Sequence, residues 1–234
     1  MRISTLFISA LLAVSAMPGH ASELFKPFRA VYKAQWDMGI SFGGDAVGVL
    51  KRDGDRWVSS LSAEALIARV NEFSEFTVQN QTVQPQHYEY HRKVIGGDKD
   101  AVLQFNWNTG TVLNDVAKKP WTMDVAPGTQ DNLSYQMQLR LDLAAGKETL
   151  VYKVADGGKI KTYPFIKLGT ETVTTAIGSF EAVKVQRDRG TDSKRNTYIW
   201  FAPELDYIVI KLQQVEKSGK EYSLLINKLE FTDP

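Results

Sequence analysis

The two residues best spaced to bind a metal ion in this 234-residue chain are His87 and His91. On a helix, a four-residue spacing places both imidazoles on one face, as in zinc enzymes. The segment that contains them, HYEYHRKV, has the alternation of a strand, in which four residues span about 13 Å, too far for two ligands of one ion. We therefore expect no metal site. The sequence also has no cysteine to supply a thiolate.

Carboxylates are the other groups that could perform acid–base chemistry. No pair of them is marked by its spacing, and neither histidine has a serine and an aspartate at the spacing of a known catalytic triad. Gly39, Gly43 and Gly44 lack the Lys-Ser/Thr that completes a phosphate-binding loop. We therefore favour a protein without enzymatic activity or cofactor, and a hydrolase is the third hypothesis. Its candidate carboxylates are Asp124, Asp131, Glu171, Glu181 and Glu204.

Aromatic and large apolar side chains offer a different chemistry, the binding of an apolar ligand. Such residues usually fill a core, but they also line the cavities of wide β-barrels. Both interpretations remain open at this stage. The residues that we predict to contact a ligand are Phe105, Trp107, Met137, Leu141 and Trp200.

The charge balance limits the partners of the chain. Lys and Arg number 28 against 27 Asp and Glu, and 43% of the residues are hydrophobic. These values are typical of a globular protein. Because the positive and negative charges are nearly equal in number, we expect no nucleic-acid partner.

The first 21 residues have the pattern of an export signal. Arg2 precedes an apolar segment, residues 3–16, and Gly19-His20-Ala21 fits the small-x-small rule for cleavage. We expect cleavage after Ala21 and a periplasmic or secreted product that does not span the membrane. A retained anchor is the alternative, but a bilayer needs about 20 apolar residues. Residues 22–234 are predicted to form a single β-rich domain.

The rest of the sequence alternates apolar and polar residues in short segments that end at Gly, Asp and Asn. This pattern predicts twelve or thirteen strands linked by hairpin turns. Gln84-Pro85 is predicted to separate two of them, 76–83 and 87–95, and residues 65–70 could form a helical turn. A long meander must curl to cover its edges. The predicted fold is therefore all-β, a large curved antiparallel sheet or barrel.

One helix is predicted, over residues 132–143, as a lid or plug of the sheet. Asp131 is a suitable N-cap, and Gly146 is suited to end the helix. An apolar stripe predicts that one face packs on the sheet, while the other face is polar. The stripe is Leu133, Met137 and Leu141, and the polar side is Gln136, Gln138, Arg140 and Asp142.

Four segments, in order, resemble motifs of an uncharacterised exported bacterial family, domain of unknown function 3108. They are MGISFGG at 38–44, PGTQDNLS at 127–134, TAIGSFEAVK at 175–184 and WFAPELDY at 200–207. The resemblance covers residues 28–231 and implies an exported all-β protein, of a kind compared with half-barrel lipoprotein carriers. It implies no catalytic residue. Cap and turn chemistry accounts for Asp131, Gly178 and Pro203 within these motifs.

Two further hypotheses of function stand ahead of the hydrolase. The first is a periplasmic protein of cell-envelope maintenance that binds a hydrophobic or lipid-like ligand on the concave face of the sheet. The second is an interaction module that docks another envelope protein and has no small ligand. A cavity above about 300 Å³ would favour the first, and a solid core with an exposed apolar patch would favour the second.

Overall fold

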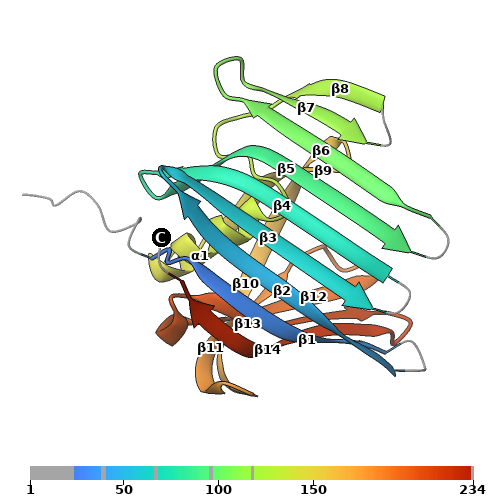
Figure 1. Cartoon of the computed structure of the whole chain (residues 1–234), viewed down its shortest axis with the longest axis vertical. Helices are drawn as coiled ribbons and strands as arrows, with labels where there is room; N and C mark the ends of the chain where they lie inside the picture. The colour runs from blue at the N-terminus through green and yellow to red at the C-terminus, as the bar shows by residue number, and fades with distance from the viewer. Residues whose placement is uncertain (1–23, 38–40, 66–67, 95–96, 117–118, 233–234) are drawn as a thin grey trace, which may run out of the picture.

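The computed structural model describes residues 24–37, 41–65, 68–94, 97–116 and 119–232 (Figure 1). The predicted signal peptide and the predicted turn at residues 38–39 lie outside these ranges. The strands are β1 (Phe28–Asp37), β2 (Ser41–Asp53), β3 (Arg56–Ala65), β4 (Ala68–Gln79), β5 (Thr82–Val94), β6 (Lys99–Asn106), β7 (Thr111–Val116), β8 (Lys119–Asp124), β9 (Leu150–Asp156), β10 (Lys159–Thr175), β11 (Gly178–Arg187), β12 (Arg195–Ala202), β13 (Ile208–Glu216) and β14 (Glu221–Phe231).

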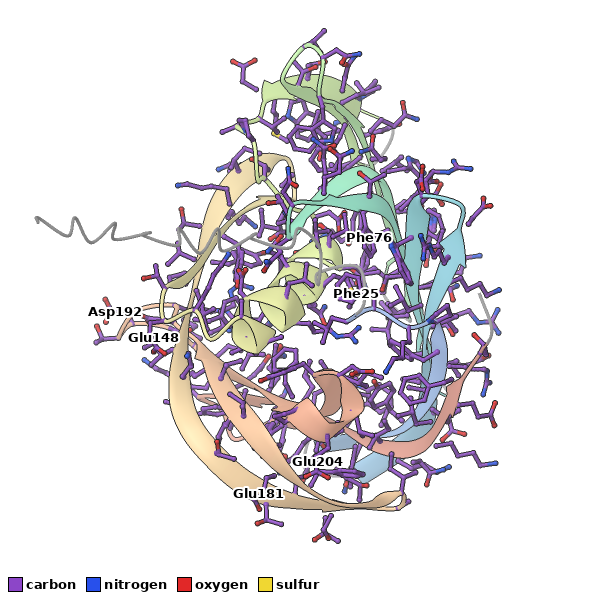
Figure 2. All side chains as sticks on the ribbon, turned by 90° about the vertical axis from the view of Figure 1, so that its left-hand side faces the viewer. Phe25, Phe76, Glu148, Glu181, Asp192 and Glu204 are labelled. Atoms are coloured by element: carbon purple, nitrogen blue, oxygen red, sulfur yellow. The ribbon has the colours of Figure 1, made fainter. Side chains whose placement is uncertain are left out.

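All these strands belong to one antiparallel sheet of 14 strands, which confirms the predicted fold class. The chain meanders outward from β1 to β8, forms helix α1 (Ser134–Ala144), and returns from β9 to β14, which pairs with β1. The sheet curves so strongly that its strands form a ring around α1 (Figure 2). A short 3-10 turn, η1 (Pro203–Leu205), follows β12, where Pro203 ends the strand as expected.

The edge strands β8 and β9 meet without a ladder of backbone hydrogen bonds between their described residues. The chain just before α1 covers the edge of β9 instead. Gln130 donates its backbone N–H to the Lys153 oxygen and accepts the N–H of Ala155, each at 2.8 Å. Trp121 of β8 lies over the β9–β10 turn, where a Cβ on Gly158 would meet its ring at 1.8 Å. The ring of strands is therefore closed by the backbone of Gln130 and by the side chain of Trp121.

Asp131 lies in the turn before the helix, which begins at Ser134 with Leu133 at the N-cap position, so the predicted cap and start are each two residues early. Its carboxylate accepts the backbone N–H groups of Leu133 and Ser134 at 2.8 and 2.7 Å, and the hydroxyl of Ser74 on β4 at 2.7 Å. These bonds satisfy donors that a helix start leaves free and join the helix to the sheet.

The helix has the predicted polar face, but the expectation that only the apolar face packs on the sheet is wrong, because the polar face is buried as well. Gln138, Arg140 and Asp142 are only 7%, 1% and 5% exposed. The sheet surrounds the helix, and all three side chains have hydrogen-bond partners inside, although the Nε of Arg140 has none among the described residues. Arg140 donates to the backbone oxygen of Asp206 at 3.0 Å and lies 5.0 Å from the ring centre of Phe25.

Two glutamine side chains bind backbone groups of β5 that no neighbouring strand pairs with. Strand β6 pairs only with residues 87–92 of β5, which leaves the preceding residues of β5 without a neighbour on that side. There the Val83 N–H donates to Gln138 Oε1, and Gln130 Nε2 donates to the Val83 oxygen, both at 2.7 Å. Trp107 Nε1 donates to the Pro85 oxygen at 2.7 Å.

The break predicted at Gln84-Pro85 is wrong. The turn comes earlier, at Asn80-Gln81, where both residues have positive φ, 49° and 62°. Pro85 lies inside β5 at a bulge opposite Glu75 and Phe76. The bulge in the β4–β5 ladder and the absence of β6 beside this part of β5 accommodate proline, which has no N–H.

Three other boundaries differ from the prediction. The segments 160–165 and 171–175 form one strand, β10, bent at a bulge near Gly169, which has a φ of +104°. Residues 65 and 68–70 extend β3 and β4 rather than a helical turn. Strand β8 was not predicted, because all its residues but Met123 are exposed and show no alternation of burial.

Gln138→Leu is expected to destabilise the protein by about 1–3 kcal/mol, because the Val83 N–H would remain buried without a partner. Chemical denaturation followed by circular dichroism measures this loss. Gln104→Leu, at an exposed position of β6, is the matched control and should change the free energy of unfolding by less than about 0.5 kcal/mol. Equal effects of the two substitutions would contradict the role given to Gln138.

Candidate functional site

The inner face of the curved sheet lines a partly open cavity of about 460 Å³, which we call the lumen. Alternate residues of the strands point into it, and residues 132–136 at the start of α1 form its floor. Its apolar side chains include Leu61, Leu103, Leu212 and Leu224. Its polar side chains include Glu72, Tyr88, Tyr90, Asn114, Asn132, Tyr135, Gln136, Asp156, Tyr163, Arg187, Arg189, Arg195, Thr197 and Gln214.

Three arginines line one wall of the lumen. Arg187 stacks on Tyr163, with its guanidinium carbon 3.1 Å from the ring centre. Arg189 donates to the hydroxyl of Thr197 at 2.9 Å. Burial and the charges of Arg187 and Arg195 lower the pKa of Arg189 to about 10. The wall therefore concentrates positive charge.

The wall formed by β4 and β5 carries a carboxyl group. Glu72 accepts a hydrogen bond of 2.5 Å from the Tyr88 hydroxyl. Burial, aided by the negative charges of Asp131 and Asp156, raises the pKa of Glu72 from 4.5 to about 7. At neutral pH its carboxyl group is therefore only partly ionised and offsets little of the arginine charge.

Asn114 of β7 lies in the same cavity and is 0% exposed. Neither its amide nitrogen nor its amide oxygen has a hydrogen-bond partner among the described residues. Buried amides in folded proteins normally have partners, so a free one at a cavity wall marks a place where a bound group could complete the bonding.

The floor of the lumen is a polar and aromatic network. Asp156 accepts hydrogen bonds from Lys161 and from the Tyr163 hydroxyl at 2.6 and 2.7 Å. Those donors hold the pKa of Asp156 below its usual value, although burial acts in the opposite direction. Tyr135 of the helix packs edge-on against Tyr163, with 5.5 Å between the ring centres.

Two smaller hollows adjoin the lumen and share lining residues with it. One, of about 410 Å³, shares Leu61, Tyr90, Gln214 and Tyr222 and adds Trp36, Ala63, Val70 and Arg92. The other, of about 100 Å³, lies under the helix. It shares Leu61, Gln136, Leu212 and Leu224 and adds Phe28, Tyr32, Met137 and Val209.

The structure does not bring the five predicted ligand-contact residues together. Met137 borders the hollow under the helix, and Leu141 lies in the core. Phe105 and Trp107 stack on each other at 5.4 Å, near the end of β6. Trp200 is 1% exposed and donates to Glu171 at 2.6 Å.

The five carboxylates considered for a hydrolase are also spread over the molecule. Asp131 lies just before the helix, Asp124 ends β8, and Glu171 accepts from Trp200. Glu181 and Glu204 are exposed and lie near the bottom of Figure 2. His87 and His91 lie on the outer side of β5, where both contact Glu89, at 2.7 and 3.1 Å. In the described part of the chain, no three His, Asp or Glu side chains converge as a metal site.

A larger groove, of about 940 Å³, lies on the outer side of the sheet between β10 and strands β1, β2, β13 and β14. Its charged groups pair with one another, as Lys33 does with Asp45 at 2.8 Å. An open groove with paired charges encloses a ligand less well than the lumen does, so the lumen is the stronger candidate site.

Sequence reasoning missed the charged residues of the lumen. Glu72 stands in phase with Val70, Ser74, Phe76 and Val78, so the alternation of β4 indicates that it points inward. That signal is lost when the strand is taken to begin at Phe76. Arg187, which follows the buried Val185 by two residues, carries the same signal on β11.

The sequence matches the model of a family described as "Protein of unknown function (DUF3108)" over residues 31–225. The chain belongs to the DUF3108 family. The matched range of this DUF3108 protein includes Gln130, which bonds to the edge of β9, and Asp131, which bonds to the first turn of α1.

A solved structure resembles this DUF3108 protein in fold. A β-barrel-like protein of the domain of unknown function DUF1849 from Brucella abortus has a TM-score of 0.60 and 11% identity, covering 89% of this chain and 98% of that one. A DUF1329 family protein from Desulfovibrio piger has 7% identity and covers 90% of this chain and 88% of that one. Its TM-score of 0.28 is too low to indicate a common fold. No curated protein matches the sequence.

Among the described residues, no helix has the length and apolar character needed to cross a membrane.

The raised pKa of Glu72 predicts that stability falls as the pH rises. The unfolded chain releases this proton near pH 4.5 and the folded protein near pH 7, so the folded state binds more protons between these values. Asp131, with a pKa raised from 3.8 to about 6, acts in the same direction. Together the two groups are expected to lower the free energy of unfolding by on the order of 5 kcal/mol from about pH 4.5 to about pH 8, about 3 kcal/mol of it from Glu72.

Glu72→Gln tests the assignment, because glutamine can still accept the Tyr88 hydroxyl but does not titrate. Thermal denaturation across this pH range should show a shallower slope for Glu72→Gln than for the wild type. Glu230→Gln, at an exposed position of β14, should keep the wild-type slope. A Glu72→Gln protein with the wild-type slope would refute the prediction.

Proposed function

We propose that this DUF3108 protein is an exported binding protein of the cell envelope that holds a hydrophobic or lipid-like ligand in its lumen. The observation that carries the proposal is a partly open cavity of about 460 Å³ between the sheet and the helix. This volume lies in the range of small-molecule sites. Leu61, Leu212 and Leu224 supply apolar surface that continues into the hollow under the helix.

Export belongs to the same proposal. Residues 1–21 have the pattern of a cleaved signal peptide, and residues 22–234 would form the mature, single β-rich domain. The intact mass of the protein recovered from the periplasm tests this point, since a chain that begins at Ser22 is expected. A mass that includes Arg2 would contradict it.

Docking of another envelope protein is the second candidate function. Val151, Ile166 and Leu168 are about half exposed, at 51%, 48% and 47%, on β9 and its neighbour β10. Apolar side chains near a sheet edge are typical of surfaces that bind proteins. The lumen is favoured because it also offers partly enclosed volume.

Ala101→Trp is expected to weaken binding of a neutral apolar probe, N-phenyl-1-naphthylamine, about 10-fold or more. Ala101 lines the lumen on β6, so the indole would occupy the space that the probe needs. Fluorescence titration measures the change. Gln104→Trp, three residues on and exposed on the same strand, is the control and should bind as the wild type does.

Native mass spectrometry of the protein from its own host provides an independent measurement. We expect a bound lipid-like mass that is released on denaturation and reduced in Ala101→Trp. Absence of both probe binding and a bound mass would favour the docking function instead.

A further inference from the structure

The charges inside the lumen do not balance. Six cationic side chains line the lumen and its larger adjoining hollow: Arg92, Lys99, Arg187, Arg189, Arg195 and Lys220. The carboxylates nearby are mostly engaged. Asp156 pairs with Lys161 at 2.6 Å, and Glu216 contacts Arg195 at 3.6 Å. Glu72, with its pKa raised to about 7, is about half protonated at neutral pH.

Arg187 and Arg189 are the least compensated of these cations. Within the described residues neither forms an ion pair with a carboxylate, and the Nε of Arg187 is buried without a hydrogen-bond partner. Arg189 has the Thr197 hydroxyl as its partner, and Arg187 has the face of Tyr163. Both side chains are half-buried, and guanidinium groups that lack a carboxylate partner favour a bound oxyanion, to which they donate paired hydrogen bonds.

A second, independent feature points to a polar group in the same space. The amide of Asn114 on β7 is fully buried at the lumen wall and has no partner among the described residues. It can donate to an oxyanion or accept from a hydroxyl, so a ligand with a polar head would satisfy it.

The apolar part of the lumen lies beside this polar part. Leu61, Leu212 and Leu224 line both the lumen and the hollow under the helix, where Phe28 and Met137 add to the apolar surface. A ligand that fills the whole space therefore needs a charged end and an apolar end.

We infer that the ligand is an anionic amphiphile, whose carboxylate or phosphate head binds Arg187, Arg189 and Arg195 while its apolar chain lies along Leu61, Leu212 and Leu224. This inference rests on the proposed function and specifies its ligand class. The shared chemistry is an oxyanion, which a lipid head group or free phosphate could supply.

Three probes separate these sources by isothermal titration calorimetry. Dodecyl phosphate has the head and the chain, dodecanol has the same chain without charge, and inorganic phosphate has the charge without the chain. We expect dodecyl phosphate to bind at least 10-fold more tightly than dodecanol and at least 100-fold more tightly than inorganic phosphate, and its affinity to fall as salt rises.

The arginines are tested by the double variant R187Q/R189Q. We expect its affinity for dodecyl phosphate to fall about 10- to 100-fold while its affinity for dodecanol stays within about threefold of wild type. R187K/R189K keeps the charge and should recover part of the affinity. R29Q/K51Q makes the same change in charge at exposed outer positions and should bind dodecyl phosphate as the wild type does. If thermal denaturation shows R187Q/R189Q to be unfolded, R195Q, at a more exposed position, replaces it.

Each outcome decides between the two proposals. Equal affinity of the wild type for dodecyl phosphate and dodecanol would overturn the anionic head while the apolar site stands. Inorganic phosphate that binds as tightly as dodecyl phosphate would overturn the amphiphile in favour of a free oxyanion. Failure of all three probes and of N-phenyl-1-naphthylamine would overturn the proposed function itself.

Discussion

A long sheet that curls into a ring must satisfy the backbone groups at its free edges, and here one short segment does most of that. The backbone of Gln130 pairs with β9, through Lys153 and Ala155, and its side chain donates to Val83 of β5. The next residue, Asp131, binds Ser74 of β4 and the first turn of the helix. Gln130 and Asp131 therefore join three parts of the fold: strands β1–β8, the helix, and strands β9–β14.

This arrangement explains why the interior is both hollow and polar. Gln130 and Gln138 bond to the free edge of β5 on the inside of the ring. The helix therefore carries polar side chains on its buried surface, where Gln138 also donates to Asp142. The space beyond the start of the helix stays open, and the side chains that face it include tyrosines and arginines. The inner face of the sheet thus changes from an apolar core around Leu141 to a charged wall around Arg189.

The sequence predicts the parts of this fold that depend on local pattern. Alternation and turn residues predict most strands, and the helix is found, although it begins two residues later than predicted. Prediction fails where a partner distant in the chain decides the outcome. Gln138 and Arg140 are polar by type, yet the surrounding sheet buries them. Proline usually interrupts a strand, but Pro85 lies within β5. A bulge accommodates its ring, and the Trp107 indole donates to its backbone oxygen.

The same distinction applies to the candidate site. A conspicuous tryptophan such as Trp200 attracts attention in a sequence, whereas Glu72 and Arg187 look like ordinary surface charges. Only the curvature of the sheet, which no local pattern encodes, places their side chains in one cavity.

The seam between β8 and β9 has a mechanical consequence. Elsewhere around the ring, neighbouring strands are joined by ladders of backbone hydrogen bonds, but here the described residues meet through the Gln130 bridge and the contact of Trp121 with the turn at Gly158. Parting the wall along this line disrupts the Gln130 bridge, the Trp121 contact and the packing of Ala155 in the apolar cluster with Leu103 and Val112, but no ladder of backbone hydrogen bonds. The ring of strands can therefore widen most easily at this seam. A ligand larger than the cavity would be accommodated by separation of β8 from β9.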